Sequence, residues 1–122
     1  MGRWWHEELS IDGDEESLLI KDITPFKNEI VLVKNKYSAF ENTNLAETLR
    51  EKKVETLIIC GVMTNLCVET TARHAFMKDF QPVVIEDACA ANTKEHHKAT
   101  LLNLSYGFAY IEKTEAIISN LL

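Results

Sequence analysis

The sequence has few cysteines, and their spacing argues against the usual roles of paired cysteine. Three of its 122 residues are cysteine (Cys60, Cys67 and Cys89), an odd number without a Cys-x-x-Cys pair. A disulfide framework needs paired cysteines, and structural zinc sites use closely spaced ones. We therefore expect neither kind of site, no metal, and a reducing, cytoplasmic location.

Long apolar runs and clusters of positive charge are also missing. The longest apolar runs are as long as a strand, far below the ~20 residues of a membrane-spanning helix. The first eight residues lack the apolar centre of a signal peptide. Thirteen basic and 19 acidic residues give a net charge of −6. We expect neither a membrane nor a nucleic acid as a partner.

No repeat, low-complexity tract or Pro/Gly/Ser-rich linker divides the chain, so we expect a single domain over residues 1–122. Apolar residues make up 46% of the sequence and charged residues 26%, which is ordinary for a globular protein. A domain of this size buries roughly two thirds of its unfolded surface. The chain is therefore long enough for a real core, although it is short for an α/β enzyme.

Apolar periodicity predicts an alternation of strands and helices. Strands are expected at 30–33, 54–60, 82–85 and 108–111, and helices at 43–52, 65–78, 93–105 and 114–121. This order is typical of a three-layer α/β/α fold with a mainly parallel, Rossmann-like sheet. Ligands bind such sheets beyond the carboxyl ends of the strands. Lys34 comes after the first of these strands, Cys67 after the second and Asp87 after the third.

Cys67 is the prime candidate for a nucleophile. It lies in the first turn of the predicted helix 65–78, where backbone N–H groups and the helix dipole favour a thiolate. A thiolate that attacks a carbonyl carbon also needs donors for the oxyanion, and the N–H groups of Met63 and Cys67 are the natural pair. The alternative is that Cys67 is a small buried apolar residue.

Other candidate residues each have two interpretations. Lys34 could place a cation beside the thiol, or it could extend into water at a strand end. Cys89 could be a redox partner of Cys67, or it could fill space beneath a loop. Trp4 and Trp5 could line an apolar pocket or interface, or they could cover the sheet.

Three segments resemble the isochorismatase-like cysteine hydrolases, which include nicotinamidases, N-carbamoylsarcosine amidases and ureidoacrylate hydrolases. The specific one is Gly61-Val62-Met63-Thr64-Asn65-Leu66-Cys67, with its continuation to residue 75; segments 31–40 and 83–88 also match. The resemblance implies that Cys67 is the nucleophile and Lys34 a triad lysine. It implies a cis Val62–Met63 peptide at the oxyanion site, a small amide, carbamoyl or vinyl-ether substrate, and no cofactor. It also suggests Trp4 and Trp5 as pocket residues.

The sequence departs from this family at its beginning. Family members start with an additional strand that ends in a catalytic aspartate, and neither has a counterpart here. The aspartate and histidines that bind metal in the nicotinamidase branch are also missing. We expect a sheet that lacks the family's first strand, with an unpaired edge beside the cysteine strand and association into a homo-oligomer. The chain is then either a cysteine hydrolase or a catalytically silent remnant that serves in binding or oligomerisation.

Overall fold

The computed structural model describes Leu19 and residues 21–121, which fall into two compact units that meet in the sequence between Val31 and Leu32. Among the described residues of the first unit, a short 3₁₀ helix η3 (Lys21–Ile23) has no buried side chain. Trp4 and Trp5 lie outside the described residues, so the predicted pocket role is not tested. That one domain covers residues 1–122 likewise stays a prediction.

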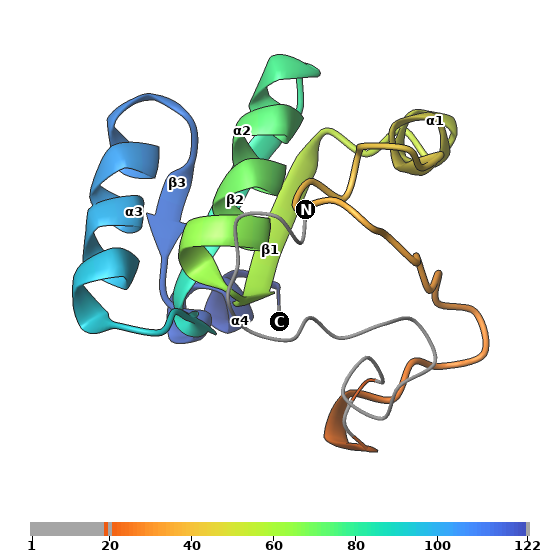
Figure 1. Cartoon of the computed structure of the whole chain (residues 1–122). Helices are drawn as coiled ribbons and strands as arrows, with labels where there is room; N and C mark the ends of the chain where they lie inside the picture. Colours follow the sequence, from red (N-terminus) through yellow and green to blue (C-terminus); the bar gives the residue numbers. More distant parts are fainter. Residues whose placement is uncertain (1–18, 20, 122) are drawn as a thin grey trace. The chain divides into compact units, whose positions relative to one another are not determined.

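A parallel sheet organises the second unit (Figure 1). Its strands are β1 (Thr56–Val62), β2 (Gln81–Ala90) and β3 (Tyr110–Glu112), in the order β1-β2-β3. Both strand pairs are parallel. The prediction of an α/β fold with a parallel sheet is therefore confirmed. The helices that follow β1 and β2 return the chain to the same end of the sheet, where the next parallel strand begins.

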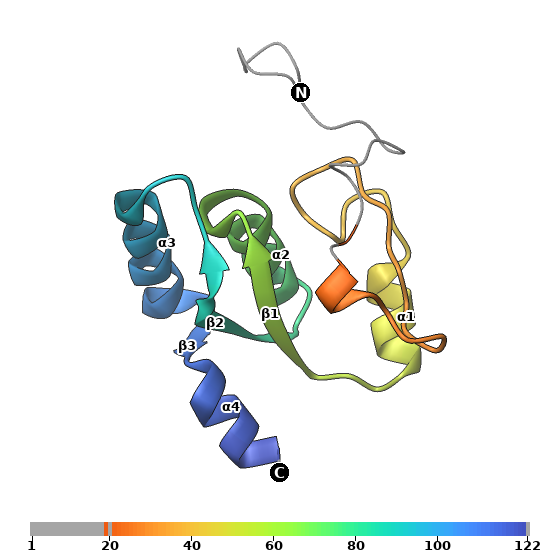
Figure 2. The same cartoon turned by 90° about the horizontal axis from the view of Figure 1, so that it is seen from below.

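The described part of this unit contains four α-helices: α1 (Leu45–Glu51), α2 (Glu69–Met77), α3 (Lys94–Gly107) and α4 (Thr114–Leu121). Helices α2 and α3 cover the same face, as expected when successive right-handed crossovers move in one direction (Figure 2). Val84 of β2 is fully buried beneath them. Ile85 points to the opposite face and is also buried, and α4 contacts β2.

Two apolar clusters hold the helices in place. One contains Phe40, Ala46, Ala75 and Phe80; the other contains Val68, Ala72, Val84 and Leu104. The alanines of α2 are fully buried, and their small side chains let the helix pack closely on the sheet. Helix α2 therefore contributes to both clusters. These contacts fix α2, which is the element that follows the predicted cysteine motif.

The prediction of a strand at residues 30–33 is wrong. These residues have no strand structure, and Val31 and Val33 are 60% and 67% exposed. A β-branched run forms a strand only where a neighbouring strand pairs with its backbone and other elements cover its side chains. No strand of Leu19 and residues 21–121 pairs with this run.

Strand β1 lies at an edge of the sheet, because β2 is its only partner among the described strands. Its exposed residues alternate with partly buried ones, as expected when one face is covered and the other open. Ile58 and Val62 are on the open face and remain largely exposed. In the part of the chain described by the structure, no helix combines the length and apolar character needed to cross a membrane.

Candidate functional site

Cys67 lies in an irregular turn that connects β1 to α2. The turn is a single π-helical segment, η4 (Thr64–Val68), in which the N–H groups of Leu66 and Val68 both donate to the Met63 carbonyl. Gly61 just before it has φ of +119°, a backbone conformation that suits glycine. The Val62–Met63 peptide bond is cis. The Cys67 side chain is half-buried, so its sulfur is neither sealed in the core nor fully in water.

The Lys34 ammonium lies directly beside this thiol. Its Nζ is 3.2 Å from Cys67 Sγ and also donates to the Lys36 carbonyl at 2.9 Å. The two side chains come from positions 33 residues apart, so the contact depends on the tertiary fold. A neighbouring cation stabilises a thiolate relative to a thiol. The contact therefore puts a cation within hydrogen-bond distance of the Cys67 sulfur in the turn that precedes α2.

The segment that follows Lys34 is fastened to α2 by side-chain hydrogen bonds. Thr71 Oγ1 accepts from the Ala39 N–H at 3.0 Å and donates to the Tyr37 carbonyl at 3.4 Å. Ser38 Oγ lies 2.8 Å from His74 Nδ1 and accepts from the Phe40 N–H. The sequence analysis did not identify these contacts, because nothing in the spacing of a threonine or histidine on a helix names its partner.

A second histidine supports the η4 turn from α3. Thr64 is completely buried, and its Oγ1 lies 2.9 Å from His97 Nδ1. Nearby, Asn65 Oδ1 is buried without a hydrogen-bond partner among the described residues. An unsatisfied buried acceptor is unfavourable. Neither feature has a recognisable signal in the sequence.

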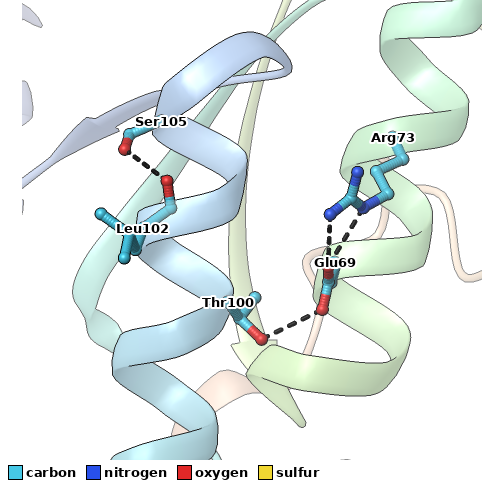
Figure 3. Close-up of polar contacts among 5 residues, drawn as sticks. All are labelled: Glu69, Arg73, Thr100, Leu102 and Ser105. Atoms are coloured by element: carbon cyan, nitrogen blue, oxygen red, sulfur yellow. Dashed lines mark hydrogen bonds and ion pairs between the residues drawn. The ribbon is translucent and has the colours of Figure 1, made fainter.

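The helix after Cys67 is also tied to α3 by a polar cluster (Figure 3). Glu69 Oε1 accepts from Arg73 Nε and Nη2 at 3.0 and 2.7 Å, and Glu69 Oε2 accepts from Thr100 Oγ1 at 3.0 Å. The Arg73 guanidinium also lies 4.2 Å from the centre of the Phe108 ring. On α3, Ser105 Oγ donates to the Leu102 carbonyl. These contacts fix the orientation of α2, and with it the direction from which η4 presents the thiol.

Asp87 does not join the thiol, although the sequence places it at the same end of the sheet. Its Oδ1 accepts from the N–H and hydroxyl of Thr114 at 2.8 and 2.9 Å, and so caps α4. These hydrogen bonds from Thr114 hold the pKa of the Asp87 carboxyl below its ordinary value of 3.8. The register of β1 and β2 shifts between Ile59 and Gly61, which accommodates extra residues of β2 around Asp87.

The other two cysteines differ from Cys67 in their surroundings. Cys60 is exposed, whereas Cys89 packs against the cluster that contains Val84 and Leu104. Burial raises the pKa of the Cys89 thiol above 9.0. Cys89 therefore has the surroundings of a small apolar residue. Its role as a redox partner of Cys67 stays a prediction.

A cavity of about 380 Å³ lies at the other end of the sheet and does not include Lys34 or Cys67. It is lined mainly by Phe76, Phe80, Phe108 and Tyr110, at the start of β2 and β3. Within the described ranges, no three His, Cys, Asp or Glu side chains gather as a group that could bind a metal. The Cys67 thiol and the Lys34 ammonium, beyond the carboxyl end of β1, are the candidate site residues that the structure brings together.

Comparison with known proteins identifies the domain. Residues 2–116 match the isochorismatase domain family. The chain is 42% identical to nicotinamidase 3 of Arabidopsis thaliana over all of its own length and 63% of that protein. It is 34% identical to a ureidoacrylate amidohydrolase of Acinetobacter baylyi, with 92% of this chain and 46% of that protein covered.

A solved structure agrees with this match. An isochorismatase-like hydrolase from Alkaliphilus metalliredigens superposes with a TM-score of 0.88 at 28% identity, covering 93% of this chain and 63% of that one. The chain spans about half to two thirds of the length of these relatives. Its parallel sheet, its helices and the matched residues 2–116 lead to one conclusion: the chain belongs to the isochorismatase family.

Proposed function

We propose that this chain carries the nucleophile of a cysteine hydrolase that acts on a small amide. The observation that carries the proposal is the 3.2 Å contact between Lys34 Nζ and Cys67 Sγ. The two relatives named above are an amidase and an amidohydrolase by name, which favours an amide over a vinyl ether. A carbamoyl compound shares the same C–N bond and belongs to the same substrate class.

The reaction begins when the Cys67 thiolate attacks the amide carbon and the carbonyl electrons move to oxygen. The N–H groups of Met63 and Cys67 donate to that oxyanion. When the intermediate collapses, the C–N bond breaks, the nitrogen takes a proton and leaves as ammonia or an amine, and a thioester remains on Cys67. Water then adds to the thioester, the C–S bond breaks, and the acid leaves while the thiolate is restored.

Lys34 stabilises the anion but, as an ammonium, cannot accept the thiol proton. The aspartate that does so in the family has no counterpart in these 122 residues, and Asp87 is occupied with Thr114. A general base typically contributes about 10²–10⁴-fold to a rate. We therefore expect the reactive thiol to be a property of this chain and fast turnover to require a carboxylate from outside it.

Hydrolysis of a panel of small amides, followed by ammonia release, tests the function. We expect slow release that disappears in Cys67→Ala and persists in Cys60→Ala, which changes a thiol elsewhere on the same chain. Release that survives Cys67→Ala would show that the thiol is not the nucleophile.

The open edge of β1 favours a second candidate, a binding or oligomerisation module without catalysis. Unpaired strand edges associate readily, and Ile58 and Val62 leave apolar surface beside this edge. The occupant we propose is a second copy of the chain, which gives a homo-oligomer. Light scattering should report a dimer or larger species that a β1 variant, Ile58→Lys, converts to monomer. Amide hydrolysis that depends on Cys67 would rule out the silent module, whereas a monomeric parent protein would rule out the homo-oligomer.

The three free thiols support a cytoplasmic location, where cysteines stay reduced. We also expect no metal, cofactor, membrane or nucleic acid to take part in the reaction. Loss of activity after treatment with a chelator would contradict the expected independence from metal.

A further inference from the structure

The η4 turn and helix α2 both contact residues 34–40, which we call the lysine segment. Cys67 comes from η4, whereas Thr71 and His74 are three residues apart on one side of α2. Cys67 meets Lys34 itself. One turn further along, Thr71 bonds the backbone at positions 37 and 39, and beyond it His74 meets the side chain at position 38.

The contacts of Thr71 and His74 are the firm part of this arrangement. Ser38 is 5% exposed and Phe40 is 6% exposed, and the Phe40 ring lies 5.5 Å from the His74 ring. The Ala39 carbonyl is also occupied, because it accepts from Thr43 Oγ1 at 2.6 Å. Residues 38–40 are therefore fixed by both packing and hydrogen bonds.

The part of the segment that carries the ammonium is held much less. Residues 33–36 are exposed and have no helix or strand structure. Among the described residues, the Lys34 ammonium bonds only to Cys67 Sγ and to the Lys36 carbonyl, the second of which lies within the segment. A long lysine side chain loses considerable rotamer freedom when it is held in one place. The position of the Lys34 ammonium at the sulfur therefore depends on the position of its backbone, which the fixed residues 38–40 determine.

We propose that Thr71 and His74 are positioning residues, which set the place of the Lys34 ammonium at the Cys67 sulfur by anchoring the lysine segment. The inference rests on the proposed function, because it gives Lys34 and Cys67 their roles in that reaction. Thr71 acts through the backbone at positions 37 and 39, and His74 acts through Ser38.

The test compares alkylation of Cys67 by iodoacetate, which is an anion, and by iodoacetamide, which is neutral. Both reagents react with the thiolate, so the amount of thiolate cancels when the two rates are divided. The iodoacetate-to-iodoacetamide ratio then reports the cation beside the sulfur. Peptide mass spectrometry follows each cysteine separately, and the exposed Cys60 provides an internal reference.

Four variants define the expected pattern. Lys34→Met should lower the ratio at Cys67 about fivefold, the effect of one charge at a few ångströms in water. Thr71→Val keeps the shape but loses both hydrogen bonds, and should lower it nearly as much. Thr71→Ser keeps the hydroxyl and should retain the parent ratio. Thr48→Val, which removes a threonine hydroxyl from α1, is the matched control and should change nothing.

A double variant separates positioning from general weakening. If Thr71 acts through Lys34, adding Thr71→Val to Lys34→Met should lower the ratio no further. Urea unfolding shows whether each variant is folded. Should Thr71→Val not fold, Ser38→Ala removes the contact to His74 with a smaller change and should also lower the ratio.

Three results would contradict different parts of the account and can be told apart. An unchanged ratio in the folded anchor variant, Thr71→Val or its substitute Ser38→Ala, would overturn the positioning role while leaving the lysine–cysteine pair intact. An unchanged ratio in Lys34→Met would instead overturn the pair and the proposed function that depends on it. A lowered ratio in Thr71→Ser equal to that of Thr71→Val would also contradict the role of the hydroxyl.

Discussion

Two β-branched runs in this chain have similar composition but different structures. Thr56–Val62 forms strand β1, whereas residues 30–33 form no strand. The first run pairs with β2, and its Leu57 and Ile59 pack against the two apolar clusters to which α2 contributes. The second has no pairing partner among the described residues. The comparison shows that β-propensity becomes a strand only where other elements bond and cover it.

The largest expected effect is on the free energy of unfolding, and it contrasts a buried with an exposed position of α3. Leu104→Ala on α3 removes a side chain with no exposure and should lower the free energy of unfolding by about 2–5 kcal/mol. Leu102→Ala is the same change at a position that is 72% exposed, and should cost less than about 0.5 kcal/mol. Urea unfolding of both variants provides the measurement. Equal losses would mean that α3 does not pack as described.

A second prediction concerns the lysine that follows the uncovered run. Lys34→Met should slow alkylation of Cys67 by iodoacetamide about fivefold at neutral pH, because the cation that stabilises the thiolate is lost. Lys36→Met removes an exposed cation two residues away and should leave the rate nearly unchanged. A rate that falls equally in both variants would indicate a general effect of charge and not a specific contact.

The smallest expected effect is the pH dependence of the cap on α4. The folded pKa of Asp87 is lowered, so its ionised form stabilises the fold at pH values above the unfolded pKa near 3.8. That contribution is lost as the pH falls below 3.8 and through the folded pKa. Asp87→Asn should therefore lower stability at neutral pH, with the difference from the parent shrinking in acid. A difference that does not change between pH 6 and pH 3 would contradict this role.

The sequence was sufficient for the parts of the fold that depend on local pattern. The strands at β1, β2 and β3 follow from apolar runs. Thr93, at the start of the predicted helix 93–105, caps α3, with its side chain accepting from the His96 N–H. The glycine at position 107 ends the same helix. Each of these features depends on residues that are neighbours in the chain or on simple periodicity.

The features that the sequence could not provide depend on tertiary partners. Residues 30–33 have the composition of a strand but no neighbouring strand among the described residues, and Asp87, expected just after a strand, lies within β2 and caps α4. The contacts of His74 with Ser38 and of His97 with Thr64 join residues more than 30 positions apart. Residue type and spacing do not determine such pairs.

The central claim is that the setting of Cys67 makes its sulfur the reactive one. Exposure alone predicts the opposite, because Cys60 is exposed and Cys67 is only half-buried. The most direct measurement is the rate of iodoacetamide addition to each cysteine of the parent protein at neutral pH, followed by peptide mass spectrometry. The account predicts that Cys67 reacts first, and faster addition to Cys60 would contradict it.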